Sequence, residues 1–99
     1  MVKRKIVWTQ KAFEERKEIL AYWIERNQSK TYSVKLNKLI KETIQIAALY
    51  PDTGRITTFK NVRVKIIRDY FLFYEVNKTT LVVLSIWDGR RNDRTLIIK

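Results

Sequence analysis

The chain has 99 residues, the size of one compact domain with a single hydrophobic core, and it leaves no room for a second core. It contains no cysteine and no histidine, which excludes disulfides, cysteine-ligated zinc and catalysis by an imidazole or a thiolate. Its 21 lysines and arginines outnumber the 10 acidic residues, and the net charge of +11 predicts a nucleic acid or an acidic protein as partner.

The apolar content of 45% is high enough for a folded rather than a disordered chain. No apolar run approaches the roughly 20 residues that are needed to span a bilayer, and no N-terminal stretch resembles a signal peptide. We therefore expect a cytoplasmic protein that makes no contact with a membrane.

The chain begins with the pattern of a strand followed by a helix. Residues 3–8 alternate between charged and bulky side chains, as a short strand does. Thr9 is a typical N-cap, and apolar residues recur at helical spacing over residues 10–26. The first helix is therefore predicted to be amphipathic.

A second helix is predicted after a short break. Ser29 carries a hydroxyl that can cap its start, and Pro51 ends it. The two helices then form a hairpin. Residues 52–55 have the composition of a turn, in which Gly54 is free to adopt a positive φ.

The second half of the chain has the two-residue period of strands. In its first run, apolar residues alternate with Arg63 and Lys65, which therefore share one basic face. Residues 70–76 and 81–87 are two further strands, joined by a turn at residues 77–80. Both are apolar on their two faces, which predicts central positions in a sheet.

Together these elements predict an α+β fold. An N-terminal strand and a helical hairpin precede an antiparallel three-stranded meander, which completes a small twisted sheet. The helices are expected to cover one side of this sheet. The tail after the last strand is rich in arginine.

This order of elements resembles the RelE/ParE superfamily of bacterial type II toxins, over nearly the whole chain. The segments that carry the resemblance are residues 6–9 (IVWT), 51–55 (PDTGR), 62–65 (VRVK), 69–76 (DYFLFYEV) and 86–92 (IWDGRRN). The resemblance implies a single RelE/ParE-like toxin domain. It also implies a cognate antitoxin protein that wraps the basic domain and holds it inactive.

The resemblance leaves two targets open. RelE-like members cut mRNA in the ribosomal A site without a metal, whereas ParE-like members poison DNA gyrase and are not enzymes. In neither case is a cofactor expected, and operator DNA is expected to be contacted only through the antitoxin.

If the chain cuts mRNA, the resemblance implies a catalytic set of Arg63, Lys65 and Arg90. Cleavage through the ribose 2′-hydroxyl needs a base, an acid and cations that hold the charge of the phosphorane. Arg63 and Lys65 share a face and can address one phosphate. Lys65 would be the base, since a lysine beside other cations loses its proton more readily. Arg90 would bind the phosphate near the end of the sheet.

Four further residues are candidates for holding the substrate: Arg55, Phe71, Trp87 and Arg91. The two arginines would reach the same groove, and the two aromatic rings would stack on bases. The commoner role of exposed arginines is solvated surface charge, and aromatic residues in strands more often pack in a core.

The chain also departs from the RelE pattern. Phe71 stands where the superfamily's arginine is expected, and Arg94, Thr95 and Leu96 occupy the region of its C-terminal tyrosine or histidine. A toxin without ribonuclease activity is therefore one alternative. A degenerate toxin that serves only as a basic nucleic-acid- or protein-binding module is another.

Overall fold

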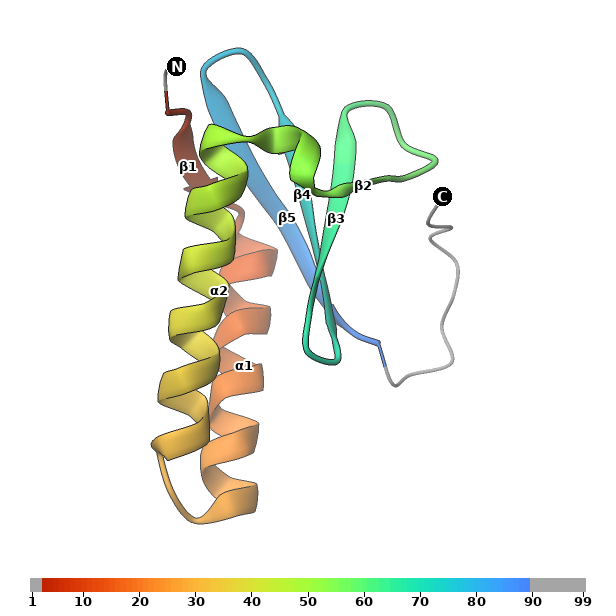
Figure 1. Ribbon diagram of the computed structural model, residues 1–99. Helices are drawn as coiled ribbons and strands as arrows, with labels where there is room; N and C mark the ends of the chain where they lie inside the picture. Colours follow the sequence, from red (N-terminus) through yellow and green to blue (C-terminus); the bar gives the residue numbers. More distant parts are fainter. Residues whose placement is uncertain (1–2, 90–99) are drawn as a thin grey trace.

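The computed structural model describes residues 3–89, which form one mixed sheet with a helical hairpin packed against it (Figure 1). The elements in chain order are β1 (Lys5–Trp8), α1 (Gln10–Asn27), α2 (Thr31–Leu49), the 3₁₀ helix η1 (Pro51–Thr53), β2 (Arg55–Ile56), β3 (Val62–Ile67), β4 (Tyr70–Val76) and β5 (Thr80–Asp88). The predicted α+β order is confirmed.

The strands of the sheet lie in the order β1-β5-β4-β3-β2. The first strand runs parallel to β5, and all other neighbours are antiparallel. Both apolar strands, β4 and β5, occupy the central positions that the sequence predicts. The edge strand β2 is not among the predicted elements, because a two-residue strand has no measurable period.

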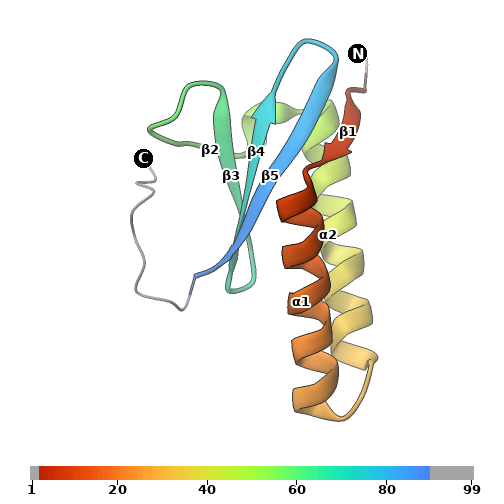
Figure 2. The ribbon, with the colours of Figure 1, turned by 180° about the vertical axis from the view of Figure 1, so that it is seen from behind.

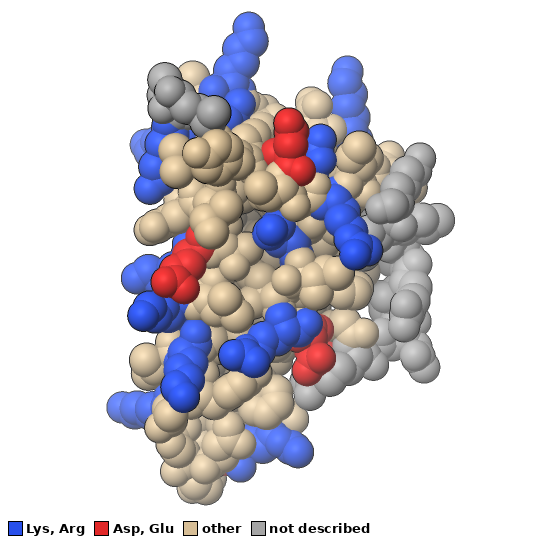
Figure 3. All heavy atoms as spheres, in the orientation of Figure 1, with Lys and Arg blue, Asp and Glu red and all other residues tan. Residues whose placement is uncertain are grey.

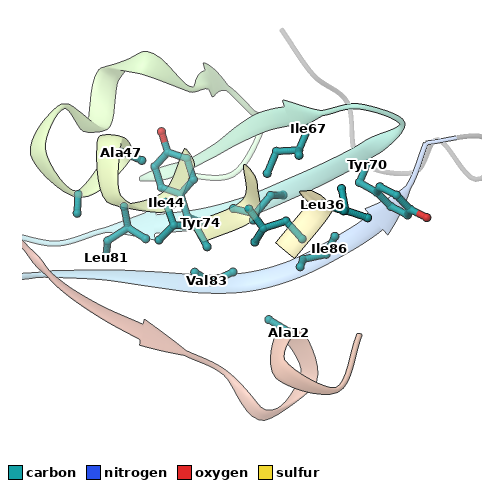
Figure 4. Packing of buried hydrophobic residues seen from close by; sticks show 13 residues of the cluster. Ala12, Leu36, Ile44, Ala47, Ile67, Tyr70, Tyr74, Leu81, Val83 and Ile86 are labelled. Carbon is teal, nitrogen blue, oxygen red and sulfur yellow. The ribbon is translucent and has the colours of Figure 1, made fainter. Parts of the chain in front are cut away.

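Both helices lie on the same face of the sheet, and their hairpin extends past the turn between β3 and β4 (Figures 1 and 2). The core lies between this hairpin and the central strands (Figure 4). It joins Leu36 and Ile40 of α2 to Leu72 of β4 and to Leu81 and Val83 of β5, each at most 1% exposed. Burial of this apolar surface provides most of the driving force for folding.

The helix ends follow local rules, with one difference from the sequence prediction. Thr9 caps α1, because its hydroxyl accepts a hydrogen bond from the Ala12 amide at 3.1 Å. For α2 the cap residue is Lys30, and Ser29 lies one position earlier, where its Oγ accepts the Thr31 amide at 3.2 Å.

Across residues 3–89, no helix is both long enough and apolar enough to cross a membrane.

An aromatic cluster ties the far part of the hairpin to the sheet. The indole Nε1 of Trp23 donates a hydrogen bond of 2.7 Å to the hydroxyl of Tyr70. Tyr32 of α2 meets the same indole edge-on, with ring centroids 4.9 Å apart. The hairpin is therefore anchored near the β3–β4 turn as well as through the core.

The sheet has two faces, which the strand register assigns. Residues directly opposite each other on neighbouring strands share a face. The helix-side face therefore contains Arg63, Lys65 and Ile67 of β3, which lie opposite Tyr74, Leu72 and Tyr70 of β4. What we call the second face contains Arg55, Val64, Ile66, Phe71, Phe73 and Trp87.

Candidate functional site

The residues of the PDTGR segment form a turn that Arg63 holds against the sheet. The Nη1 of Arg63 donates a hydrogen bond of 2.8 Å to the Gly54 carbonyl. Its Nη2 lies 3.2 Å from Oδ1 of Asp52, whose side chain is 90% exposed. Because that carboxylate is solvated, the ion pair adds little stability, and the bond to the Gly54 carbonyl is the stronger constraint.

Tyr74 completes this arrangement from the neighbouring strand. Its hydroxyl donates to the Pro51 carbonyl at 2.6 Å and accepts from the Gly54 amide at 3.1 Å. Burial raises the pKa of this hydroxyl above its ordinary value, although the hydrogen bond from Gly54 and the charge of Arg63 oppose the rise. We call Pro51–Gly54, Arg63 and Tyr74 the turn clamp.

Gly54 has a different role from the one that its sequence suggests. Its φ is −82°, in the extended region that any residue adopts, so positive φ is not what requires glycine here. Instead, a Cβ at this position would overlap the Tyr74 hydroxyl. The glycine is needed because the tyrosine approaches the backbone closely.

Lys65 is the second predicted catalytic residue on this face. It lies two positions after Arg63 on β3, so the two side chains point to the same side of the sheet. Lys65 is half-buried, and within residues 3–89 its ammonium group has no hydrogen bond or ion pair. Lys65 therefore differs from Arg63, whose guanidinium is bonded to Gly54 and Asp52 in the turn clamp.

Three predicted substrate-binding residues lie together on the second face. Phe71 and Trp87 are directly opposite each other in the β4–β5 register. The ring of Trp87 also meets Phe73 edge-on, with centroids 5.4 Å apart. Arg55 joins them at the edge of the same face, opposite Val64.

The structure therefore separates the predicted set into two groups. Arg63 and Lys65 are on the helix-side face, whereas Arg55, Phe71 and Trp87 are on the other side of the sheet. The predicted catalytic and substrate-binding residues that the structure describes therefore do not share one face of the sheet. The remaining candidates, Arg90 and Arg91, lie outside the described residues, which end at Gly89 with its amide bonded to the Asp69 carbonyl at 2.6 Å.

Two structurally important polar residues are missing from the predicted set. Tyr74 is one, and its position within a strand of apolar residues gives no local sign of its hydrogen bonds to the turn. Glu15 is the other: its Oε1 accepts the Ile86 amide and the Ser85 hydroxyl, each at 3.0 Å. The Glu15 carboxylate thereby bonds the backbone of β5 beyond Val83, where the pairing with β1 ends.

The described residues also limit the chemistry of the site. Between residues 3 and 89, no group of three or more carboxylates is arranged to hold a metal ion. Within the turn clamp, the Tyr74 hydroxyl bonds the Gly54 amide and the Pro51 carbonyl, and the Arg63 guanidinium bonds the Gly54 carbonyl. Of the predicted site residues that the structure describes, Lys65 has no bonded partner on the helix-side face, and Phe71, Trp87 and Arg55 lie on the second face.

Comparison with known proteins places the chain in a family. The model for the ParE toxin of the type II toxin–antitoxin system parDE matches residues 6–93. A chain of the chromosomal ParDE TA system from P. aeruginosa matches with a TM-score of 0.72 and 17% identity, covering 85% of this chain and 94% of that one. At that identity the match shows a shared fold. No curated protein matches the chain significantly.

Proposed function

The chain belongs to the ParE toxin family of type II toxin–antitoxin systems, and from this we propose that it stops growth by binding DNA gyrase. Membership in the family makes it a type II toxin and implies a cognate antitoxin as its partner. The proposal concerns the target, for which the sequence alone leaves gyrase and ribosome-bound mRNA as alternatives.

The observation that carries the proposal is the engagement of Arg63. A ribonuclease needs cations whose N–H groups face the scissile phosphate. Here the guanidinium donates to the Gly54 carbonyl and pairs with Asp52, so it holds a turn of the toxin itself. Cleavage would also need a base, an acid and further cations around the phosphate, and of the other two predicted catalytic residues only Lys65 is among the described residues.

A binding mechanism needs no such assembly. A toxin that poisons an enzyme requires a stable surface complementary to its target, and the helix-side core and the turn clamp supply a rigid scaffold for that surface. We further propose that an acidic segment of the antitoxin neutralises the toxin, because a domain with a net charge of +11 attracts such a segment.

The test is induced expression in a bacterium with and without the antitoxin. We expect growth arrest, DNA breaks and intact mRNA when the toxin is expressed alone, and normal growth when both are expressed. The purified toxin should also inhibit supercoiling by purified gyrase. Messenger RNA cut within codons, with undamaged DNA, would assign the ribosome as the target instead.

Lys65 provides the sharper comparison. Lys65→Ala should leave DNA breaks and growth arrest within about twofold of the wild type, because proton transfer, which can contribute roughly 10²-fold or more to an enzyme, is not used. Lys60→Ala, an exposed lysine in the loop before β3, is the matched control. Loss of toxicity in the Lys65 variant alone, together with loss of mRNA cleavage, would contradict the gyrase proposal.

A further inference from the structure

Lys30 is the N-cap of α2, and Lys35, Lys38 and Lys41 follow within the helix. All four are exposed, and the last three are spaced three residues apart. At that spacing each side chain lies about 60° around the helix and about 4.5 Å along it from the previous one. We call Lys35, Lys38 and Lys41 the α2 lysine row; Lys30 lies five residues before Lys35, about 140° around the helix, and is not in line with it. Lys35 and Lys38 face away from the buried residues Leu36, Ile40 and Ile44, and Lys41 lies at the flank of that buried face.

The charges of this row are not neutralised by the described part of the chain. Within residues 3–89, none of the three ammonium groups of the row, nor that of Lys30, makes a hydrogen bond or an ion pair. Glu42 is the acidic residue of α2, and although it lies one turn beyond Lys38, the two side chains are not paired. In Figure 3, basic side chains predominate along the side of the molecule that α2 forms in Figure 1.

This arrangement does not serve the stability of the helix. Like charges one turn apart repel each other. The N-cap is itself a lysine without a side-chain cap, and the first turn has no acidic residue to balance the positive end of the helix dipole. A bound anion would relieve the repulsion between the lysines of the row, and near the first turn it would also be attracted by the positive end of the helix dipole.

We propose that the α2 lysine row binds the phosphate backbone of a nucleic acid. From Lys35 to Lys41 the row extends about 9 Å at 1.5 Å per residue. A DNA strand presents a phosphate about every 3.4 Å along its axis, so about two or three phosphates lie within reach of the row. Such contacts attract any sequence and need no apolar pocket.

An acidic protein fits the row less well. The centres of protein interfaces are depleted in lysine and enriched in aromatic and apolar groups. The exposed apolar residues of α2 near the row are Val34, which is 64% exposed, and Ile46, which is 51% exposed, and they lie 12 residues apart rather than forming one apolar patch. Phosphates, in contrast, are matched by lysines acting as point charges.

The row is distinct from the residues considered for the toxin's target, and the inference does not depend on gyrase. The test measures binding of the purified full chain to a labelled 20-base-pair DNA duplex of random sequence over a range of salt concentrations. We expect log K to fall linearly with log salt, with a slope of about 0.9 for each phosphate neutralised.

The decisive variant combines Lys35→Gln, Lys38→Gln and Lys41→Gln. We expect it to reduce the salt slope by about 0.9 for each phosphate that is no longer neutralised, and by no more than about 2.7 in total. Because like charges are removed from an exposed helix, the variant should remain folded, which thermal unfolding followed by circular dichroism will check. The control carries Lys5→Gln, Lys60→Gln and Lys78→Gln, three exposed lysines elsewhere that give the same net charge.

The outcomes separate a localised surface from a general charge effect. A reduced slope in the α2 variant and a nearly unchanged slope in the control support the row as a phosphate-binding surface. With single-stranded RNA the expected salt slope is about 0.7 for each phosphate neutralised. A slope that falls in the α2 variant but not in the control would again support the row, and it would identify RNA as a second source of phosphate. If the salt slope falls by the same amount in both variants, the effect is one of net charge alone, and the inference is overturned. The inference is also overturned if the chain binds polyglutamate more tightly than either nucleic acid and the α2 variant loses this binding.

Discussion

The two faces of the sheet use their residues in different ways. On the helix-side face, Leu72, Leu81 and Val83 are at most 1% exposed and pack against the hairpin. On the second face, Val64 and Phe73 are also buried, but neither belongs to that cluster, and Ile66 beside them is 48% exposed. One face is closed by the helices, whereas the other keeps apolar surface accessible at its edge.

The same contrast applies to charged and aromatic residues. Arg63 points to the helix side, where even a guanidinium becomes part of the scaffold by bonding a backbone carbonyl. Phe71 and Trp87 point to the second face and are only half-buried. A residue type that suggests chemistry in the sequence can therefore serve structure or recognition, and the face on which it lies decides which role is open to it.

The largest expected difference between the faces is in packing. Leu72→Ala should lower the free energy of unfolding by about 2–5 kcal/mol, because it leaves a cavity in the core between the helices and the sheet. Ile66→Ala, on the second face of the neighbouring strand, should cost less than about 1 kcal/mol, since that side chain is already half solvated. Urea unfolding of both variants measures this, and equal losses would show that the two faces are closed alike.

A smaller effect is expected in the turn clamp. Tyr74→Phe removes the hydroxyl that bonds Pro51 and Gly54, and a buried amide and carbonyl left unpaired should cost about 1–3 kcal/mol. Tyr50→Phe, at a tyrosine that is 52% exposed, is the matched control and should change stability by less than about 0.5 kcal/mol. If both variants unfold at the same urea concentration, the clamp contributes nothing to stability.

The smallest effect concerns pH. The pKa of Tyr74 is raised in the folded state above its ordinary value of 10.0, mainly by burial. The unfolded chain therefore releases this proton first, so the contribution of Tyr74 is complete below pH 10 and declines as pH rises toward the folded pKa. The stability difference between the wild type and Tyr74→Phe should narrow above pH 10. A difference that stays constant to about pH 11.5 would mean that Tyr74 titrates alike in both states.

The sequence by itself determined the features that depend on neighbouring residues. Thr9 caps α1 because its hydroxyl reaches an amide three residues away, and apolar runs on two adjacent strands place β4 and β5 in the centre of the sheet. The RelE/ParE resemblance is confirmed by the family match over residues 6–93. Alternation along β3 also puts Arg63 and Lys65 on one face.

Only the tertiary structure decided which face of the sheet carries Arg63 and Lys65 and which groups these side chains contact on that face. A two-residue period separates the two sides of a strand, but it does not say which side the helices cover. The partners of Arg63 and Tyr74 lie 9 to 23 residues away, and β1 pairs with β5 across most of the chain. These contacts form only when distant segments pack together, so no local pattern encodes them.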